Sequence, residues 1–294
     1  MHRLHFGSSP LVFVAPLSLL FLDVWGPAPI LSKNSKCYYL CIVDDFSCYS
    51  WLFPLTAKSN VFSTFVTFWT LVEKNFNLPI KSVQSDGGRE FILLQHYFNF
   101  MGINYRQTCS HTHHQNGSVE RKHRHIVDTG LALLSHSKVS FQFWDKAFDT
   151  ATFLINRLPS SINKQKSPSE LLFGEIPDYK FCKTFGCECF PYLRPYNTNK
   201  FSFRSKSCVF LGYSKPYTGY KCLDILTGKI YIARHVIFNE SVFPFQNLSS
   251  SLSPPKSAPS AIPSSLPRVF SLPNGSTLVS HLHSKSSSTR SLSL

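Results

Sequence analysis

The sequence predicts an α/β fold, in which a mixed sheet with flanking helices precedes a small β-rich domain and a disordered tail. Short apolar runs separated by turn signals lie between Leu17 and Leu55, a pattern typical of three adjacent strands. From Asn60 to Phe76 apolar residues recur at helical spacing, and a short strand-like run follows at Ile80–Gln84. Because a helix that links two strands returns the chain to the same sheet, parallel neighbours are expected in it.

The rest of the first domain should alternate helices with one further strand. The patterns predict, in chain order and with approximate ends, a helix at Phe91–Met101, a strand at Ile103–Gln107, and helices at Asn116–Ser137 and Phe141–Leu158. Pro159 should stop the last helix. We therefore assign residues 1–16 to an N-terminal remnant, 17–160 to the α/β domain and 161–180 to a polar linker with one short helical turn.

The character of the chain changes after the linker. From Phe181 to Glu240, short β-rich runs alternate with turns such as Thr227-Gly228-Lys229, which predicts a small β-barrel over residues 181–240. Four runs are expected to be strands: Cys187–Tyr192, Ser207–Tyr213, Tyr220–Ile225 and Ile230–Phe238. Residues 241–294 become rich in Ser, Pro and Leu without an apolar period, so we expect a disordered tail there.

The charge balance favours a polyanionic partner. The chain carries 30 Lys and Arg against 16 Asp and Glu, a formal net charge of +14. Basic side chains that neutralise phosphates release counterions, so nucleic acid is the first candidate. The apolar run Leu11–Leu22 is shorter than the roughly 20 residues that a membrane-spanning helix needs. We interpret it as leading into a buried strand that ends at Asp23, and we expect no membrane association.

Three acidic residues stand at positions that suit metal chemistry. Asp23 ends an apolar strand, Asp86 follows the strand before Gly87-Gly88, and Glu120 lies in the first turn of a helix. Strand ends and helix starts converge at one edge of a sheet, and clustered carboxylates can hold the paired divalent cations of phosphodiester chemistry. A structural alternative stays open, in which Asp86 forms a turn, Glu120 complements the helix dipole and Asp23 caps a turn.

Ordered motifs surround these acids. They read Asp23-Val24-Trp25-Gly26-Pro27, Val43-Asp44-Asp45-Phe46-Ser47, Gln84-Ser85-Asp86-Gly87-Gly88-Arg89-Glu90-Phe91 and His113-His114-Gln115-Asn116-Gly117-Ser118-Val119-Glu120-Arg121-Lys122-His123-Arg124. Further segments continue the series at Phe143–Phe148, Leu154–Pro159, Lys166–Pro168, Phe185–Cys187 and Phe210–Tyr213. Together, over about residues 17–240, they resemble the integrase core of copia-type retrotransposons, a retroviral-type integrase.

The resemblance implies an RNase H-like five-stranded mixed sheet with flanking helices, followed by an SH3-like domain. It implies that Asp23, Asp86 and Glu120 are catalytic residues that bind two Mg²⁺ or Mn²⁺ ions. The implied activity is that of a polynucleotidyl transferase, which processes the 3′ ends of element-end DNA and transfers them into target DNA. It further implies a homo-multimer on DNA and a nuclear location with a cytoplasmic particle stage.

Residues beside the acids are candidate DNA contacts. Gln115 and Asn116 would hydrogen-bond DNA, with an N-cap role for Asn116 as the alternative. Arg121, Lys122 and Arg124 would bind phosphates, with a solvated basic face as the alternative.

The sequence departs from the family pattern in two respects. Only 33 residues separate Asp86 from Glu120, slightly fewer than usual. The chain also lacks the zinc domain that precedes such cores and the reverse transcriptase that follows, which indicates a polyprotein fragment. An inactive remnant that only binds nucleic acid is therefore the alternative to an enzyme. A hydrolase of RNA–DNA hybrids is less favoured, because the run from Gln115 to Lys122 resembles integrases specifically.

Overall fold

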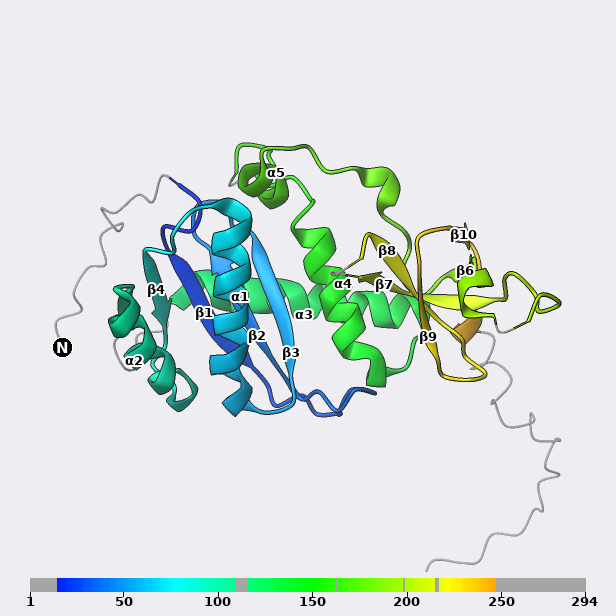
Figure 1. The fold of residues 1–294 in the computed structure, drawn as a ribbon, viewed down its shortest axis with the longest axis horizontal. Helices are drawn as coiled ribbons and strands as arrows, with labels where there is room; N and C mark the ends of the chain where they lie inside the picture. Colours follow the sequence, from blue (N-terminus) through cyan, green and yellow to red (C-terminus); the bar gives the residue numbers. More distant parts are fainter. Residues whose placement is uncertain (1–14, 109–115, 162, 198, 215–216, 247–294) are drawn as a thin grey trace, which may run out of the picture. The chain divides into compact units, whose positions relative to one another are not determined.

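The computed structural model describes residues 15–108, 116–161, 163–197, 199–214 and 217–246. Its first sheet has five strands in the order β3-β2-β1-β4-β5 (Figure 1). These strands are β1 (Leu20–Trp25), β2 (Tyr38–Asp44), β3 (Ser50–Leu55), β4 (Ser82–Ser85) and β5 (Asn104–Gln107). The pairs β1–β2 and β2–β3 are antiparallel, whereas β1–β4 and β4–β5 are parallel. The predicted mixed five-stranded sheet is thus confirmed.

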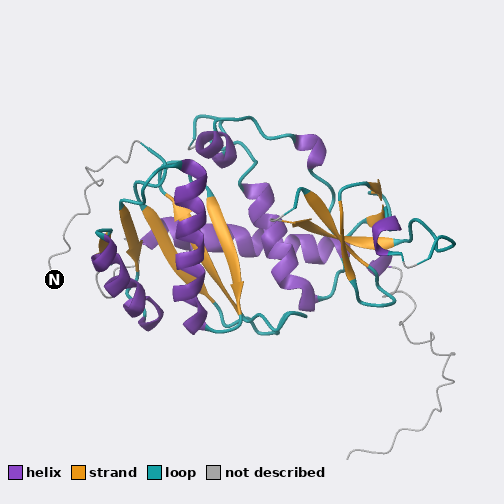
Figure 2. Cartoon of the chain, in the orientation of Figure 1, coloured by secondary structure: helices purple, strands orange, loops and turns teal. Residues whose placement is uncertain are grey.

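Helices cover both faces of this sheet, as Figure 2 shows. They are α1 (Val61–Phe76), α2 (Ile92–Met101), α3 (Gly117–Ser137) and α4 (Trp144–Ile155). A short helix, α5 (Pro168–Phe173), follows α4 in the chain. Short 3₁₀ turns lie at Lys58–Asn60, Arg89–Phe91, Phe141–Phe143, Tyr179–Phe181 and Arg194–Tyr196. The helix expected at residues 141–158 is therefore shorter than predicted, because its start is a 3₁₀ turn and α4 ends at Ile155. Asn156 keeps a helical backbone conformation, with its N–H bonded to the Thr152 carbonyl, while its side chain bonds Ser50.

The alternation of side chains along β1 divides the core into two layers. Leu20 and Leu22 pack with the buried apolar residues of α1 and α2. Leu19 and Phe21 belong instead to a cluster with Val119 of α3 and residues of α4. Since successive strand residues point to opposite faces, Asp23 follows Phe21 onto the face covered by α3.

The second sheet is antiparallel, with five strands in the order β10-β6-β7-β8-β9. These strands are β6 (Glu188–Pro191), β7 (Cys208–Ser214), β8 (Gly219–Leu223), β9 (Ile230–Ala233) and β10 (Val236–Asn239). The run expected as one strand at residues 230–238 is divided between β9 and β10, which lie at opposite edges of the sheet. The β-rich domain was predicted correctly, and the number of its strands was not.

The second sheet shares part of its core with the first domain. Val209 and Leu211 of β7 are fully buried in the cluster that contains α3 and α4. Gly212 on the same strand has φ +103°, and a Cβ there would stand 2.2 Å from Thr150 Oγ1 on α4. Only glycine permits this close approach of β7 to α4. The packing of the second sheet against the first domain therefore depends on Gly212.

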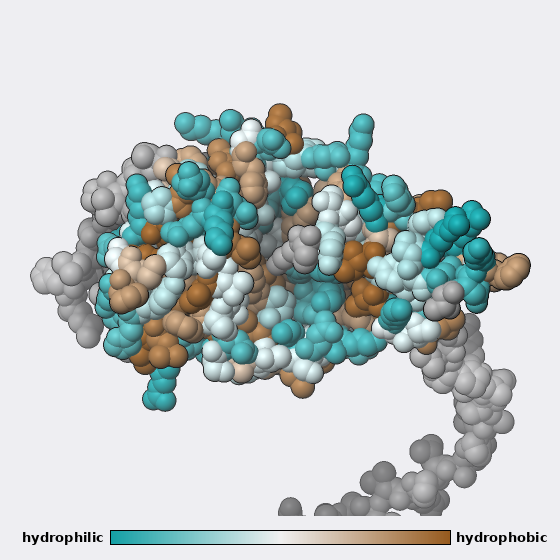
Figure 3. Space-filling view, in the orientation of Figure 1, coloured by the Kyte–Doolittle hydropathy of each residue, from teal (hydrophilic) through white to brown (hydrophobic). Residues whose placement is uncertain are grey.

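The surface of the described residues is mixed in polarity. Figure 3 shows hydrophilic residues interspersed with apolar ones on the face in view. The large apolar side chains of α2 that stay exposed are Ile92, Leu93, Phe100 and Met101. Within the described ranges no helix is long and apolar enough to cross a membrane. The predicted N-terminal remnant, except its last two residues, and the predicted tail beyond residue 246 lie outside the described residues.

Candidate active site

Asp23 lies within β1, which continues to Trp25 and does not end at Asp23 as predicted, and Asp86 directly follows the neighbouring parallel strand β4. Phe21 of β1 is paired with Gln84 of β4. Asp23 stands two residues beyond Phe21, and Asp86 stands two residues beyond Gln84, directly after the end of β4. Because the register of a parallel pair advances equally on both strands, the two carboxylates are brought to the same edge of the sheet.

The turn after β4 fixes the position of Asp86. Gly87 has φ +76°, and a Cβ there would meet the Gln107 side chain at 2.1 Å, so the turn requires glycine. The Gly88 N–H donates to Asp86 Oδ1 at 3.0 Å. Burial raises the pKa of Asp86; the Gly88 N–H opposes this rise, and the negative charge of Asp23 adds to it. The two acids are therefore close enough to repel each other.

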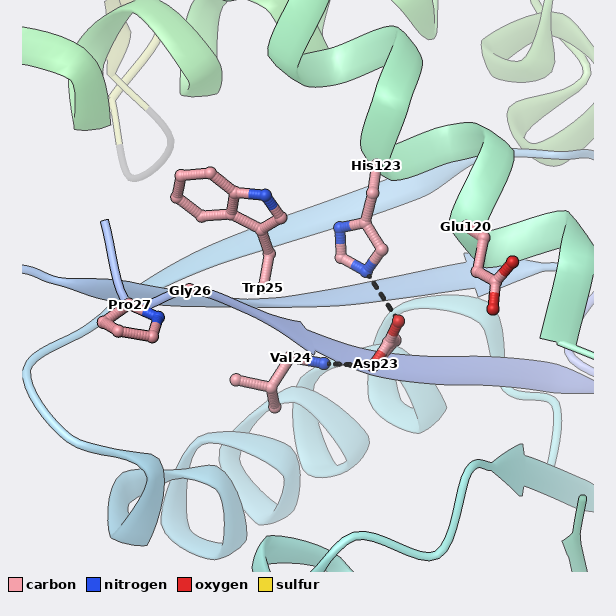
Figure 4. A pocket seen from close by; sticks show the side chains of 7 residues that line it. All are labelled: Asp23, Val24, Trp25, Gly26, Pro27, Glu120 and His123. Carbon is pink, nitrogen blue, oxygen red and sulfur yellow. Dashed lines mark hydrogen bonds and ion pairs between the residues drawn. The ribbon is translucent and has the colours of Figure 1, made fainter. Parts of the chain in front are cut away.

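Glu120 approaches Asp23 from the covering helix. It lies in the first turn of α3, and both acids line one pocket of about 410 Å³ together with His123 (Figure 4). Glu120 and His123 are three residues apart, so they project from the same side of the helix toward β1. The pocket is completed by Val24, Trp25, Gly26 and Pro27, and the Gly26–Pro27 peptide bond is cis.

His123 is a member of this site that the sequence did not reveal. Its Nε2 lies 3.2 Å from Asp23 Oδ2, and its Nδ1 lies 3.0 Å from the Tyr39 hydroxyl. The other oxygen of Asp23, Oδ1, accepts from the Val24 N–H at 2.8 Å. The only signal in the sequence was the spacing of His123 from Glu120, since Tyr39 is 84 residues away.

The donor set suits a hard divalent cation. Carboxylate oxygens are the ligands that Mg²⁺ and Mn²⁺ prefer, and a cation between Asp23 and Asp86 would offset their repulsion. Asp86, however, does not line the pocket that holds Asp23 and Glu120. Across the described ranges, no three His, Cys, Asp or Glu side chains come close enough together to qualify as a metal-binding group. The carboxylates of Asp23, Asp86 and Glu120 are chemically suited to bind Mg²⁺ or Mn²⁺. In this structure they are not gathered as closely as ligands of one bound ion.

The predicted DNA contacts have different surroundings. Arg121 and Arg124 are exposed on α3. Lys122 instead donates to the Cys48 backbone carbonyl at 3.0 Å, and burial lowers the pKa of its ammonium group. Asn116 is the N-cap residue of α3 and is buried, without a side-chain capping hydrogen bond. Gln115 lies outside the described residues.

The comparisons with known proteins agree with the predicted resemblance. Residues 187–251 match the family model described as the retroviral polymerase SH3-like domain. The retrovirus-related Pol polyprotein from transposon RE1 of Arabidopsis thaliana is 46% identical over 253 residues, which cover 86% of this chain and 17% of the relative. The corresponding polyprotein from transposon TNT 1-94 of Nicotiana tabacum is 32% identical over 242 residues, or 82% of this chain and 18% of the relative. The chain thus spans about a sixth of the length of these relatives.

Two solved structures also overlap with the fold. The cryoEM structure of a simian T-cell lymphotropic virus intasome in complex with PP2A regulatory subunit B56 gamma matches with a TM-score of 0.47 and 16% identity, covering 83% of this chain and 85% of that one. The HTLV-2 integrase catalytic core domain in complex with magnesium matches with a TM-score of 0.41 and 18% identity, covering 54% and 98%. At scores below 0.5 these likenesses carry no argument about function. In sequence, this chain is therefore similar to a segment of the retrovirus-related Pol polyproteins of plant transposons, and its residues 187–251 match the retroviral polymerase SH3-like domain.

Proposed function

We propose that this chain is the integrase catalytic domain of a retrotransposon Pol polyprotein, and that it processes element-end DNA and joins it to target DNA. The observation that carries the proposal is the meeting of Asp23 and Glu120 in one pocket, with Asp86 on the adjacent parallel strand. The homology to transposon Pol polyproteins supports it. In this proposal the catalytic core is residues 17–160, and residues 161–180 link it to the β-rich domain at 181–240.

The three acids share one role in the proposed reaction, which is to bind metal ions. Asp23, Asp86 and Glu120 would hold two Mg²⁺ or Mn²⁺ ions, which when bound supply Lewis acidity to the phosphodiester exchange. Water first displaces a short terminal segment of element-end DNA and leaves a free 3′ hydroxyl. That hydroxyl then attacks a target phosphodiester, so that one phosphate ester bond forms as another breaks. No covalent intermediate on the protein is needed.

The basic residues of the chain would hold the two DNA partners. Arg121 and Arg124 are exposed on the same helix as Glu120, where they can bind backbone phosphates beside the acids. Gln115 and Asn116 remain further predicted contacts, whereas the Lys122 ammonium group is held by the Cys48 carbonyl. We propose that the chain works as a homo-multimer on DNA. The site of action would be the nucleus, after a cytoplasmic particle stage.

A second candidate function is nucleic-acid binding without catalysis. It is favoured by the spacing of the acids, because among the residues that the structure describes no three metal-binding side chains form a close group. The net charge of +14 would serve this function equally well.

The distinguishing experiment is Mn²⁺-dependent cleavage and joining of a labelled oligonucleotide that carries the element's end. Asp86→Asn removes one proposed ligand and keeps the size of the side chain. Asp128→Asn removes an exposed acid from α3 and serves as the matched control. Activity in the parent and the control that is lost in Asp86→Asn supports the enzyme. Three inert proteins that still bind DNA in a salt-dependent way support the binding remnant.

A further inference from the structure

His123 connects the proposed metal site to the core of the first domain. The side chain is 8% exposed and lies between Asp23 of β1 and Tyr39 of β2, on the face of the sheet that α3 covers. Tyr39 is fully buried, and its ring stacks on Trp25 with centroids 5.1 Å apart. The imidazole therefore contacts the buried hydroxyl of Tyr39 on one side and the carboxylate of Asp23, which lines the pocket, on the other.

The two contacts define the tautomer. If Nδ1 accepts from the Tyr39 hydroxyl, the ring proton resides on Nε2, the ring nitrogen that lies 3.2 Å from Asp23 Oδ2. At 3.2 Å the Nε2–Oδ2 contact is electrostatic rather than a well-aligned hydrogen bond, since Nε2 has no partner that meets strict angular criteria.

We propose that His123 is a positioning residue, whose Nε2–H holds the Asp23 carboxylate in the orientation that binds a divalent cation. The proposal rests on the proposed function, in which Asp23 is a metal ligand. The Val24 N–H donates to Oδ1 at 2.8 Å and His123 Nε2 lies 3.2 Å from Oδ2, so each oxygen of Asp23 has a polar neighbour before an ion arrives. Partners of this kind reduce the loss of side-chain freedom on metal binding, and their removal costs about 10- to 100-fold in metal affinity.

A structural role for His123 is distinguishable from a positioning role. An asparagine side chain places an amide near the position of the imidazole Nδ1 and can keep the contact with Tyr39. A glutamine side chain reaches the position of Nε2 and can keep an N–H toward Asp23. If positioning is the role, His123→Gln should preserve the metal site, whereas His123→Asn should preserve only the contact with the core.

The test is calorimetric titration of the full 294-residue chain with Mn²⁺, without DNA, for the parent and four variants. The variants are His123→Ala, His123→Gln, His123→Asn and Asp23→Asn, and each is melted in EDTA to compare folding. We expect the Mn²⁺ affinity to fall about 10-fold or more in His123→Ala and His123→Asn, and to recover in His123→Gln. The recovery should appear even where the melting temperatures of the three His123 variants agree.

The outcomes separate this inference from the function on which it rests. If the parent binds Mn²⁺, Asp23→Asn does not, and His123→Ala binds as the parent does, the positioning role is wrong and the metal site stands. The same holds if His123→Asn recovers affinity and His123→Gln does not. If Asp23→Asn binds Mn²⁺ as tightly as the parent, or the parent does not bind it, both the metal site and the positioning role are overturned.

Discussion

Asn156, at the end of α4, is hydrogen-bonded to both backbone polar groups of Ser50 on the edge strand β3. Its Oδ1 accepts from the Ser50 N–H at 2.9 Å and from Ser50 Oγ at 3.1 Å, and its Nδ2 donates to the Ser50 carbonyl at 2.7 Å. The amide thus takes the place of a neighbouring strand at this point of the sheet. It is 2% exposed, so water cannot replace it.

Loss of this amide should destabilise the first domain. Asn156→Ala leaves a buried N–H and a buried carbonyl of Ser50 without partners, and each such group costs about 1–3 kcal/mol. We expect the free energy of unfolding in urea to fall by about 2–4 kcal/mol. Asn99→Ala, at an exposed position of α2, is the control and should change it by less than about 0.5 kcal/mol. Equal stability of the two variants would contradict the role given to Asn156.

Local patterns predicted most of the first sheet, and long-range contacts explain the errors. The buried run Leu19–Leu22 indicated β1 correctly, because both faces of that strand are covered and every residue of the run is apolar. The hydrogen bonds between the Asn156 side chain and Ser50 span 106 residues, so periodicity could not show them. The division of residues 230–238 into two strands likewise depends on partners elsewhere in the chain.

In the candidate site, too, local patterns indicated some residues, and long-range contacts determine others. Asp23 and Asp86 were proposed because each was expected at the end of a strand, and Glu120 because it was expected in the first turn of a helix. The structure places Asp86 after β4 and Glu120 in the first turn of α3, whereas Asp23 lies within β1. His123 was not identifiable, since its position in the site depends on Tyr39 of another strand. From the sequence, Lys122 was predicted to bind phosphate like Arg121 and Arg124. The structure shows instead that its ammonium group donates to the Cys48 carbonyl.

Asp86 should lower the stability of the metal-free protein at neutral pH. Burial and the charge of Asp23 raise its pKa above the usual 3.8, so the folded state takes up a proton more readily than the unfolded state. The protonated group stabilises the fold below the unfolded pKa, and this stability is lost as the pH rises through the folded pKa. We therefore expect Asp86→Asn to melt at a higher temperature than the parent at neutral pH in EDTA.

The difference between Asp86→Asn and the parent should shrink as the pH falls through the raised pKa of Asp86, because the carboxyl group then gains its proton. Saturating Mn²⁺ should reverse the order, because an ion that binds only the folded parent stabilises it. Asp128→Asn should follow the parent in both series. A parent that melts above Asp86→Asn in EDTA at neutral pH would show that Asp86 does not repel Asp23.

The basic residues of α3 should differ in how they affect DNA binding. Each phosphate contact contributes about 0.9 to the slope of the logarithm of affinity against the logarithm of salt concentration. We expect Arg121→Ala and Arg124→Ala each to reduce the slope by about that amount, as measured by fluorescence anisotropy in a salt series. Lys122→Met should leave the slope unchanged and lower the melting temperature, because the parent side chain holds Cys48.

The slope of the Lys122→Met variant distinguishes two roles of Lys122, which are a structural contact with Cys48 and a contact with DNA phosphate. A decrease like that of the arginine variants would show that Lys122 leaves Cys48 to bind phosphate, as the sequence motif predicts. Unchanged slopes in all three variants would place the DNA on another surface of the chain.

The central claim is that Asp23, Asp86 and Glu120 act as one metal-dependent catalytic unit. It is tested most directly by the rate of Mn²⁺-dependent DNA strand joining in the parent, Asp23→Asn, Asp86→Asn, Glu120→Gln and the double variant Asp86→Asn/Glu120→Gln, with Asp128→Asn as control. We predict that each single variant falls to background, that the double variant is no worse, and that the control retains the parent's rate, since groups that act as a unit are not additive. Joining that persists in any of the three single variants would contradict the claim.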